Sequence, residues 1–165
     1  LLGSFGATDY SIKAGKVYGN LPTLLLESPP GNETYFMNHG NFNLMNEYEF
    51  VMDTYAELFL THSFHGFFLN KIPLIQKLKL REVATFKMVY GKLSADNTAA
   101  NNYLKNVEPF YIGNTAPSPK PYMEAGIGVE NIFKLIRVDA IWRLSYRNNP
   151  LAPNFGVRVG VSLDI

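Results

Sequence analysis

The sequence lacks the features that most readily assign a chain to a class. It has no cysteine, which excludes a disulfide framework and thiolate metal sites. It has no run of about 18 apolar residues, so a transmembrane helix is not expected, although membrane-spanning strands would escape that test. A net charge of +1 gives no electrostatic basis for binding nucleic acid, which we do not expect as a partner.

Motifs for catalysis and nucleotide binding are also missing. The chain has no G-x-S-x-G nucleophile elbow, phosphate-binding loop or dinucleotide fingerprint. His62 and His65 lie three residues apart, which on a strand places them on opposite faces, where they cannot share a metal ion. We therefore expect a protein that is not an enzyme and that has no catalytic residues, cofactor or metal.

What the sequence does contain is alternation with a period of two. This pattern predicts strands over residues 8–19, 49–64, 80–93, 121–130, 136–147 and 155–165. In residues 136–147, for example, Ala140 and Trp142 fall on one face, and Arg137 and Arg143 fall on the other. No segment has a convincing helical period, so the predicted fold class is all-β.

Two folds are compatible with this alternation: a soluble antiparallel sheet and an antiparallel transmembrane β-barrel. Several segments reach the roughly 9–11 residues that a strand needs to cross a bilayer at a tilt. Aromatic residues such as Tyr90, Tyr146 and Phe155 lie towards strand ends, and short or moderate joins alternate with long ones. These features favour the barrel, with one long loop at residues 20–48 and another at residues 94–120.

Six strands are too few to close a barrel, for which about eight is the working minimum. The chain also begins LLGSFGATDY, without an initiator Met or a signal-peptide pattern. We expect residues 1–165 to be the C-terminal part of an outer-membrane barrel domain, with earlier strands of the same polypeptide and a periplasmic domain upstream.

The last strand resembles the C-terminal β-signal of bacterial outer-membrane proteins. The residues that carry this assembly signal are Arg158, Gly160, Leu163 and Ile165. The resemblance implies recognition by the barrel assembly machinery through strand addition. The terminal residue of that signal is usually aromatic, and Ile165 departs from the pattern.

Longer stretches resemble one family of Bacteroidota outer-membrane proteins of unknown function, which carry an N-terminal carboxypeptidase-regulatory-like domain. The segments concerned are GNETYF (Gly31–Phe36), FNLMNEYEFV (Phe42–Val51), His62–Val83 and Pro121–Tyr146. The resemblance runs from about Ala14 onward. It implies a larger barrel, of about sixteen strands, in the bacterial outer membrane.

That family is in turn similar to the surface-antigen superfamily of barrel insertases and two-partner secretion transporters. In the superfamily, a loop inside the lumen carries an Arg-Gly-aromatic motif. The comparable loop here contains Gly31, Asn32, Glu33, Tyr35 and Phe36, in which the aromatic remains but the Arg and the following Gly do not. We expect the loop to fold back into the barrel, with Glu33 paired to a lumenal Arg or Lys. The alternative is that the loop caps the outside of the barrel and binds surface partners.

Two further expectations concern charged residues. Asp53 and Glu57 share the predicted lumenal face and should pair with lumenal bases, because a charge taken out of water needs a partner. In the join Phe67–Arg81, apolar residues alternate with cations. This join is either a simple periplasmic turn, which Pro73 favours, or an amphipathic segment at the membrane surface.

The expected function is that of a non-enzymatic outer-membrane barrel in envelope biogenesis or in protein or lipid translocation. The alternative is a passive structural barrel or an uptake receptor. Expected partners are outer-membrane lipid, the barrel assembly machinery and the remaining strands of the barrel.

Overall fold

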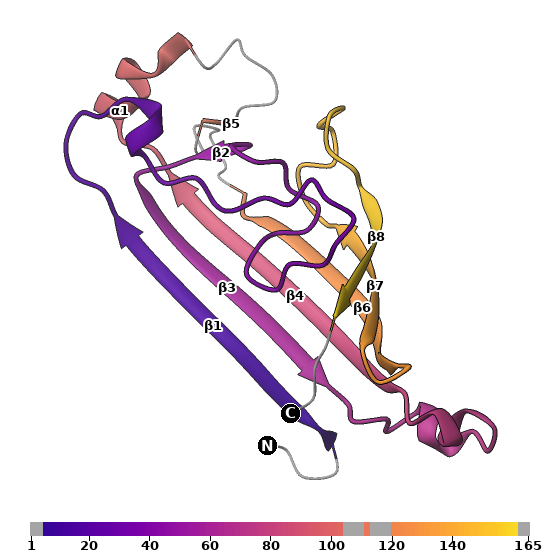
Figure 1. The fold of residues 1–165 in the computed structure, drawn as a ribbon. Coiled ribbons are helices and arrows are strands. Elements are labelled where there is room, and N and C mark those ends of the chain that lie inside the picture. Colours follow the sequence, from indigo (N-terminus) through magenta and orange to yellow (C-terminus); the bar gives the residue numbers. More distant parts are fainter. Residues whose placement is uncertain (1–4, 104–110, 113–119, 162–165) are drawn as a thin grey trace.

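The computed structural model describes residues 5–103, 111–112 and 120–161, which are mostly β-structure (Figure 1). The main sheet contains β1 (Ala7–Lys16), β3 (Thr54–Ser63), β4 (Arg81–Lys92), β6 (Tyr122–Ile132), β7 (Ile136–Arg143) and β8 (Phe155–Val161). Their order in the sheet is β1-β3-β4-β6-β7-β8, and all neighbours are antiparallel. The all-β prediction is therefore confirmed for an open sheet whose edges are β1 and β8.

One predicted strand is divided in the structure. Residues 49–64 were predicted as a single strand, but β2 (Phe50–Val51) pairs in parallel with β5 (Tyr111–Ile112) in a separate small sheet. Met52 then forms a bridge with Glu27, and β3 begins only at Thr54. The division has a physical cause: Phe50, Val51 and Met52 are all buried, so the chain is covered on both sides here and the two-sided alternation is lost.

Short helical turns are the second difference from the prediction. The helix α1 (Ala95–Ala100) begins at Ser94, whose side chain accepts a hydrogen bond from the Asn97 N–H. The 3-10 helices are η2 (Thr23–Leu25), η3 (Leu69–Lys71) and η4 (Ile75–Leu78). These elements are too short to show a helical period. Among the described residues, no helix is long and apolar enough to span a membrane.

The connections between strands divide between the two ends of the sheet (Figure 1). The joins from β3 to β4 and from β6 to β7 lie at one end, and the β6–β7 turn is the shorter of the two. β1, β4 and β7 end, and β3, β6 and β8 begin, at the other end. The predicted alternation of loop length is confirmed, except that the β7–β8 connection is short for the end that carries the long loops.

The two faces of the sheet differ sharply in polarity. The inner face, over which the β1–β2 connection lies in Figure 1, buries charged side chains from five strands: Glu57, Lys87, Glu124, Arg137, Asp139, Arg143 and Arg158. The outer face exposes apolar side chains, with Ile127 62% and Val161 70% exposed. The predicted assignment of residues to two faces is confirmed.

Asp53 links the start of β3 to the start of α1 through hydrogen bonds, at the end of the sheet that carries the long loops. Its Oδ2 accepts hydrogen bonds from Ser94 N (2.7 Å) and Asn97 Nδ2 (3.0 Å), and its Oδ1 accepts one from Thr54 Oγ1 (3.1 Å). Burial opposes ionisation of this carboxyl group, but the hydrogen bonds outweigh burial and hold the Asp53 pKa below its usual value. Asp53 therefore pairs with hydrogen-bond donors around α1, and the prediction that it pairs with a lumenal base is wrong.

We predict that the Asp53→Ala variant unfolds with a free energy about 1–3 kcal/mol lower at neutral pH, because buried donors lose their acceptor. The pKa is depressed in the folded state, so the carboxylate stabilises the fold above the unfolded-state value of 3.8. That stabilisation is lost as the pH falls through the lower, folded-state pKa. Denaturant unfolding across acid pH measures both effects. The exposed Asp96→Ala variant is the control, and an equal loss in both variants would contradict the assignment.

Candidate functional site

The candidate site is the inner face of the sheet together with the loop that covers it, residues 20–48. Phe42 is fully buried and packs edge-on against Phe59 of β3 (ring centroids 4.9 Å apart) and Tyr122 of β6 (5.3 Å). Met45 belongs to the same buried cluster, with Val89 of β4. The apolar part of the loop therefore provides the core of the domain, which agrees with the expectation that the loop folds back onto the sheet.

Glu124 of β6 is the anion that receives the loop. Its two carboxylate oxygens accept hydrogen bonds from consecutive backbone N–H groups, Asn43 N (2.8 Å) and Leu44 N (3.0 Å). The Tyr122 hydroxyl donates a third hydrogen bond at 3.1 Å. A buried carboxylate is costly without such partners, so this residue fixes the height and register of the loop above the sheet.

Three cations of the inner face bind backbone carbonyls of the same loop. Arg158 of β8 donates two hydrogen bonds to Asn43 O (3.1 and 2.7 Å). Arg143 of β7 donates to Leu44 O (3.1 Å) and forms a fully buried ion pair with Glu49. Lys87 of β4 donates to the carbonyls of residues 38, 39 and 41. Cations of the sheet thus bind the carbonyl groups of this loop, and one anion, Glu124, binds two of its N–H groups.

The Asn43 side chain organises the loop from within. Its Oδ1 accepts hydrogen bonds from Asn32 Nδ2 (2.8 Å) and Asn38 N (3.0 Å), while its Nδ2 donates to Asn38 O (3.0 Å). Asn32 also caps a tight turn, because its Oδ1 accepts hydrogen bonds from the backbone and hydroxyl of Thr34. Asn32, which was predicted from the loop motif, is therefore a structural centre of the loop, and Asn43 is a second centre that sequence reasoning missed.

The residues around Phe36 leave the core and reach the last strand. Phe36 forms a parallel bridge with Val159 of β8, in which Met37 N donates to Val159 O (2.8 Å) and Val159 N donates to Tyr35 O (3.1 Å). The side chains of Tyr35 and Phe36 are 83% and 73% exposed. The predicted loop aromatics therefore hold their position through backbone contacts and not through ring packing.

Two predicted ion pairs are absent from the described residues. Glu33 was expected to pair with a cation of residues 80–93 or 136–147, but its Oε1 accepts a hydrogen bond from Glu47 N (3.2 Å). Lys87, Arg137 and Arg143 in those ranges bind other groups. Glu57 is buried and its Oε1 has no hydrogen-bond partner. The pairing pattern differs because backbone carbonyls of the loop and the Glu49 carboxylate bind the bases that we expected to pair with Glu33, Asp53 and Glu57.

The residues of the predicted assembly signal are described in part. Arg158 is buried beneath the loop, and Gly160 is buried beside Met37, whose Cβ lies 3.0 Å from the position that a Gly160 side chain would take. Leu163 and Ile165 lie outside the described residues. Arg158 thus anchors the loop through the Asn43 carbonyl, which the pattern did not reveal.

The chemistry of this site is that of attachment. Within the described ranges, no group of three His, Asp or Glu side chains is placed to hold a metal ion. Partial burial, followed by the charges of Arg137 and Lys87, lowers the pKa of His39, which favours a neutral ring at the solvent edge of the loop. The side chains of this site hold the loop against the charged inner face of the sheet.

The fold and this site define an open antiparallel sheet with a loop fastened across its charged face. The chain belongs to the family of unknown function DUF5686, whose C-terminal domain matches residues 1–97. That range contains the motifs at Gly31–Phe36, Phe42–Val51 and His62–Val83, whereas the resemblance over Pro121–Tyr146 lies beyond it. No curated protein and no solved structure is similar enough to the chain to match it.

Gly31 provides a direct test of how the loop is fastened. A Cβ at this position would lie 2.5 Å from the Asn46 carbonyl group and 2.6 Å from Met45 O, all of which are backbone atoms. We predict that Gly31→Ala lowers the free energy of unfolding by about 1–3 kcal/mol, the usual range for an overpacked site. Limited proteolysis should cut the variant faster within residues 20–48.

Gly40→Ala is the matched control in the same loop. A Cβ there would meet only Asn38 Oδ1, at an ordinary 3.6 Å. Its unfolding and its cleavage rate should match those of the unmodified protein. Equal sensitivity of the two variants would mean that the loop is not held closely at Gly31.

Proposed function

We propose that this chain forms six strands of a larger antiparallel transmembrane β-barrel, of about sixteen strands, in the outer membrane of a bacterium. The proposal rests chiefly on the inverted polarity of the sheet. A soluble sheet buries its apolar face, whereas here the buried face carries charges and the other face exposes Tyr10, Ile12 and Ile127. Apolar side chains facing outward and polar ones facing inward are typical of a barrel in lipid.

The open edges of the sheet support a larger barrel. β1 and β8 pair on one side only within the main sheet, and a sheet edge in hydrocarbon would leave backbone groups without partners. Closure with further strands of the same polypeptide removes both edges. The apolar rows also end in aromatic residues, such as Tyr90 on β4 and the Trp142–Phe155 pair (ring centroids 5.3 Å apart) across β7 and β8.

We infer a role in envelope biogenesis or in protein or lipid translocation, without catalysis. The observation behind this inference is the loop of residues 20–48, which is held against the charged inner face and contributes a buried core there. In the proposed barrel, this face lines the lumen. A loop held in this way blocks the lumen of the proposed barrel. A blocked lumen is consistent with a channel that opens and closes. The N-terminal regulatory-like domain and the similarity to the surface-antigen superfamily belong to this proposal as well.

The second candidate is a passive structural or uptake barrel. It is favoured by the missing Arg and Gly of the superfamily motif, and by the hydrogen bond that Glu33 accepts from Glu47 N within its own loop. Conductance of the full-length protein in planar bilayers separates the two candidates. A gated barrel should conduct little until Gly31→Ala loosens the loop, whereas a passive pore should conduct steadily without any substitution.

Charge placed on the outer face should be costly if that face contacts lipid. We predict that Ala140→Arg, in the middle of β7, lowers the stability of the folded barrel by about 2–4 kcal/mol. Thr61→Arg is the control, because Thr61 lies on the inner face directly opposite Asp9 of β1. The folded fraction is measured in detergent by heat-modifiable gel mobility. Similar losses in both variants would contradict the assignment of the outer face to lipid.

The C-terminal residues should direct assembly. We predict that removal of residues 163–165 from the full-length protein leaves it degraded or aggregated in the periplasm, because strand addition to the assembly machinery needs that segment. Ile165→Phe should assemble as well as the unmodified protein or better. Surface-protein levels in isolated outer membranes measure the effect, and normal levels after the deletion would refute the signal.

A further inference from the structure

The connection between β3 and β4 combines cations with exposed apolar side chains. Residues 65–81 contain His65, three lysines and Arg81, and they contain no Asp or Glu. Several of the apolar residues between these cations are exposed: Phe68, Ile72, Leu74 and Leu78, with Leu74 81% exposed. This composition is typical of a segment that lies at a membrane surface.

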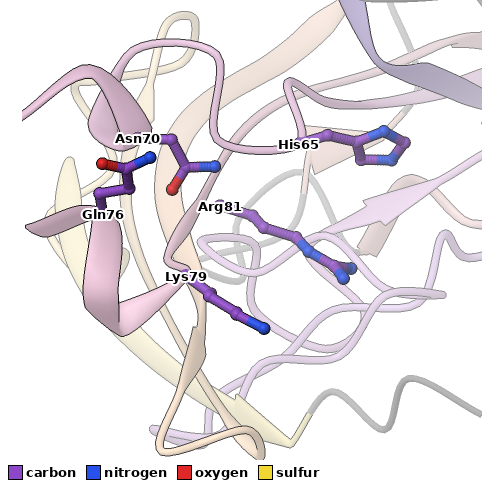
Figure 2. Close-up of a pocket in the computed structure, with 5 residues that line it drawn as sticks. All are labelled: His65, Asn70, Gln76, Lys79 and Arg81. Carbon is purple, nitrogen blue, oxygen red and sulfur yellow. The ribbon is translucent and has the colours of Figure 1, made fainter.

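The connection also encloses a pocket of about 670 Å³, lined by His65, Asn70, Gln76, Lys79 and Arg81 (Figure 2). Its volume lies within the range of small-ligand sites. In Figure 2 the side chains of Lys79 and Arg81 extend in the same direction, below the His65 ring. The polar wall is therefore rich in hydrogen-bond donors and positive charge.

The backbone at the rim of the pocket is held in an unusual conformation. His65 and Lys79 have positive φ angles, 52° and 53°, although neither is a glycine. Lys79 ends η4, and its carbonyl accepts a hydrogen bond from Nδ2 of Asn131 (2.7 Å), near the end of β6. Residues in such conformations gather at ligand sites, because the surrounding structure must hold them there.

Two carboxyl groups lie on the strands next to the connection, Glu82 on β4 and Glu130 on β6. The Glu82 carboxylate accepts hydrogen bonds from Phe68 N (3.0 Å) and from Leu69 N. Glu130 accepts a hydrogen bond from Ser63 Oγ (3.1 Å) and lies 3.9 Å from Arg137. The Asn70 Oδ1 and Glu82 Oε2 atoms are buried without a hydrogen-bond partner among the described residues.

Rings next to the pocket place it at the boundary of the apolar face. Phe64 contacts Phe68 (centroids 5.6 Å apart), Phe68 contacts Phe67 (5.0 Å), and Phe67 contacts Phe5 (5.7 Å). The Lys71 ammonium lies 4.1 Å above the Phe67 ring. Phenylalanine side chains together with lysine and arginine are typical of segments that lie in the membrane–water interface.

We propose that this pocket binds the head group of an anionic phospholipid that joins a phosphodiester to hydroxyl groups. The phosphate is held by Lys79, Arg81 and His65, and a head-group hydroxyl forms a hydrogen bond with the amide of Gln76, which is exposed and lines the pocket. The exposed apolar residues of the connection contact the acyl chains. The proposal rests on the proposed membrane location, and it makes this end of the barrel a lipid-specific contact.

The test uses the full-length protein, folded in nonionic detergent and titrated with phosphatidylglycerol by native mass spectrometry. We expect phosphatidylglycerol to bind at least about tenfold more tightly than phosphatidylcholine with the same acyl chains. Lys79→Asn should weaken phosphatidylglycerol binding about fivefold. Asparagine tolerates the left-handed backbone of this position, so the variant removes the charge and keeps the turn.

Lys134→Asn is the matched control, because Lys134 is also a left-handed lysine (φ 69°), in the β6–β7 turn at the same end of the sheet. Its binding should change by less than about twofold. Equal weakening in both variants, or equal affinity for the two lipids, would overturn the site. Inorganic phosphate that binds as tightly as the lipid would reassign it to a free anion.

Heat-modifiable mobility of each sample separates this proposal from the one on which it rests. A folded, inserted barrel that shows no lipid preference overturns the head-group site alone. A protein that does not insert into bilayers overturns the membrane location and the site together.

Discussion

The structure depends on hydrogen bonds between the buried charged side chains of the inner face and the backbone groups of the loop, each of which needs the other as a partner. Glu124 alone beneath an apolar cover would be costly, and so would the N–H groups of Asn43 and Leu44 without an acceptor. Each satisfies the other. The same exchange joins Arg158 to the Asn43 carbonyl and Arg143 to that of Leu44. One dipeptide of the loop therefore satisfies three charged residues on three strands.

Glycines of β6 leave space for the polar side chains of the inner face. A Cβ at Gly128 would lie 2.4 Å from Asp139 Oδ1, and one at Gly126 would lie 2.8 Å from Thr85 Oγ1. The space left by Gly128 allows Asp139 to form its bidentate pair with Arg137, at 2.7 and 2.8 Å. The glycines of β6 are therefore part of the electrostatics of the site, since they let polar side chains of neighbouring strands lie flat against the sheet.

The strands and their faces were predictable because a period of two survives wherever one side of a strand differs from the other. It failed at Phe50–Met52, where both sides are covered, and at α1, which has fewer than two turns. The loop motif pointed to the right segment, and Asn32 proved central. The partners were not predictable: alternation places Glu124 and Arg143 on the inner face, but nothing in it shows that they bind backbone atoms some 80 to 100 residues away in sequence. Asn43 lies within the family-like segment Phe42–Val51, but it has no charge and no place in a strand, so nothing in the sequence marked it as a structural centre.

The bridge between Phe36 and Val159 has a consequence for the edge of the sheet. A backbone N–H donates one good hydrogen bond, and Val159 directs both its N–H and its carbonyl to the loop. A strand that adds to the outer side of β8 needs those same two groups. Residues 35–37 and an incoming strand therefore compete for a single position, and anything that tightens the loop on its charged wall raises the free energy of opening that edge.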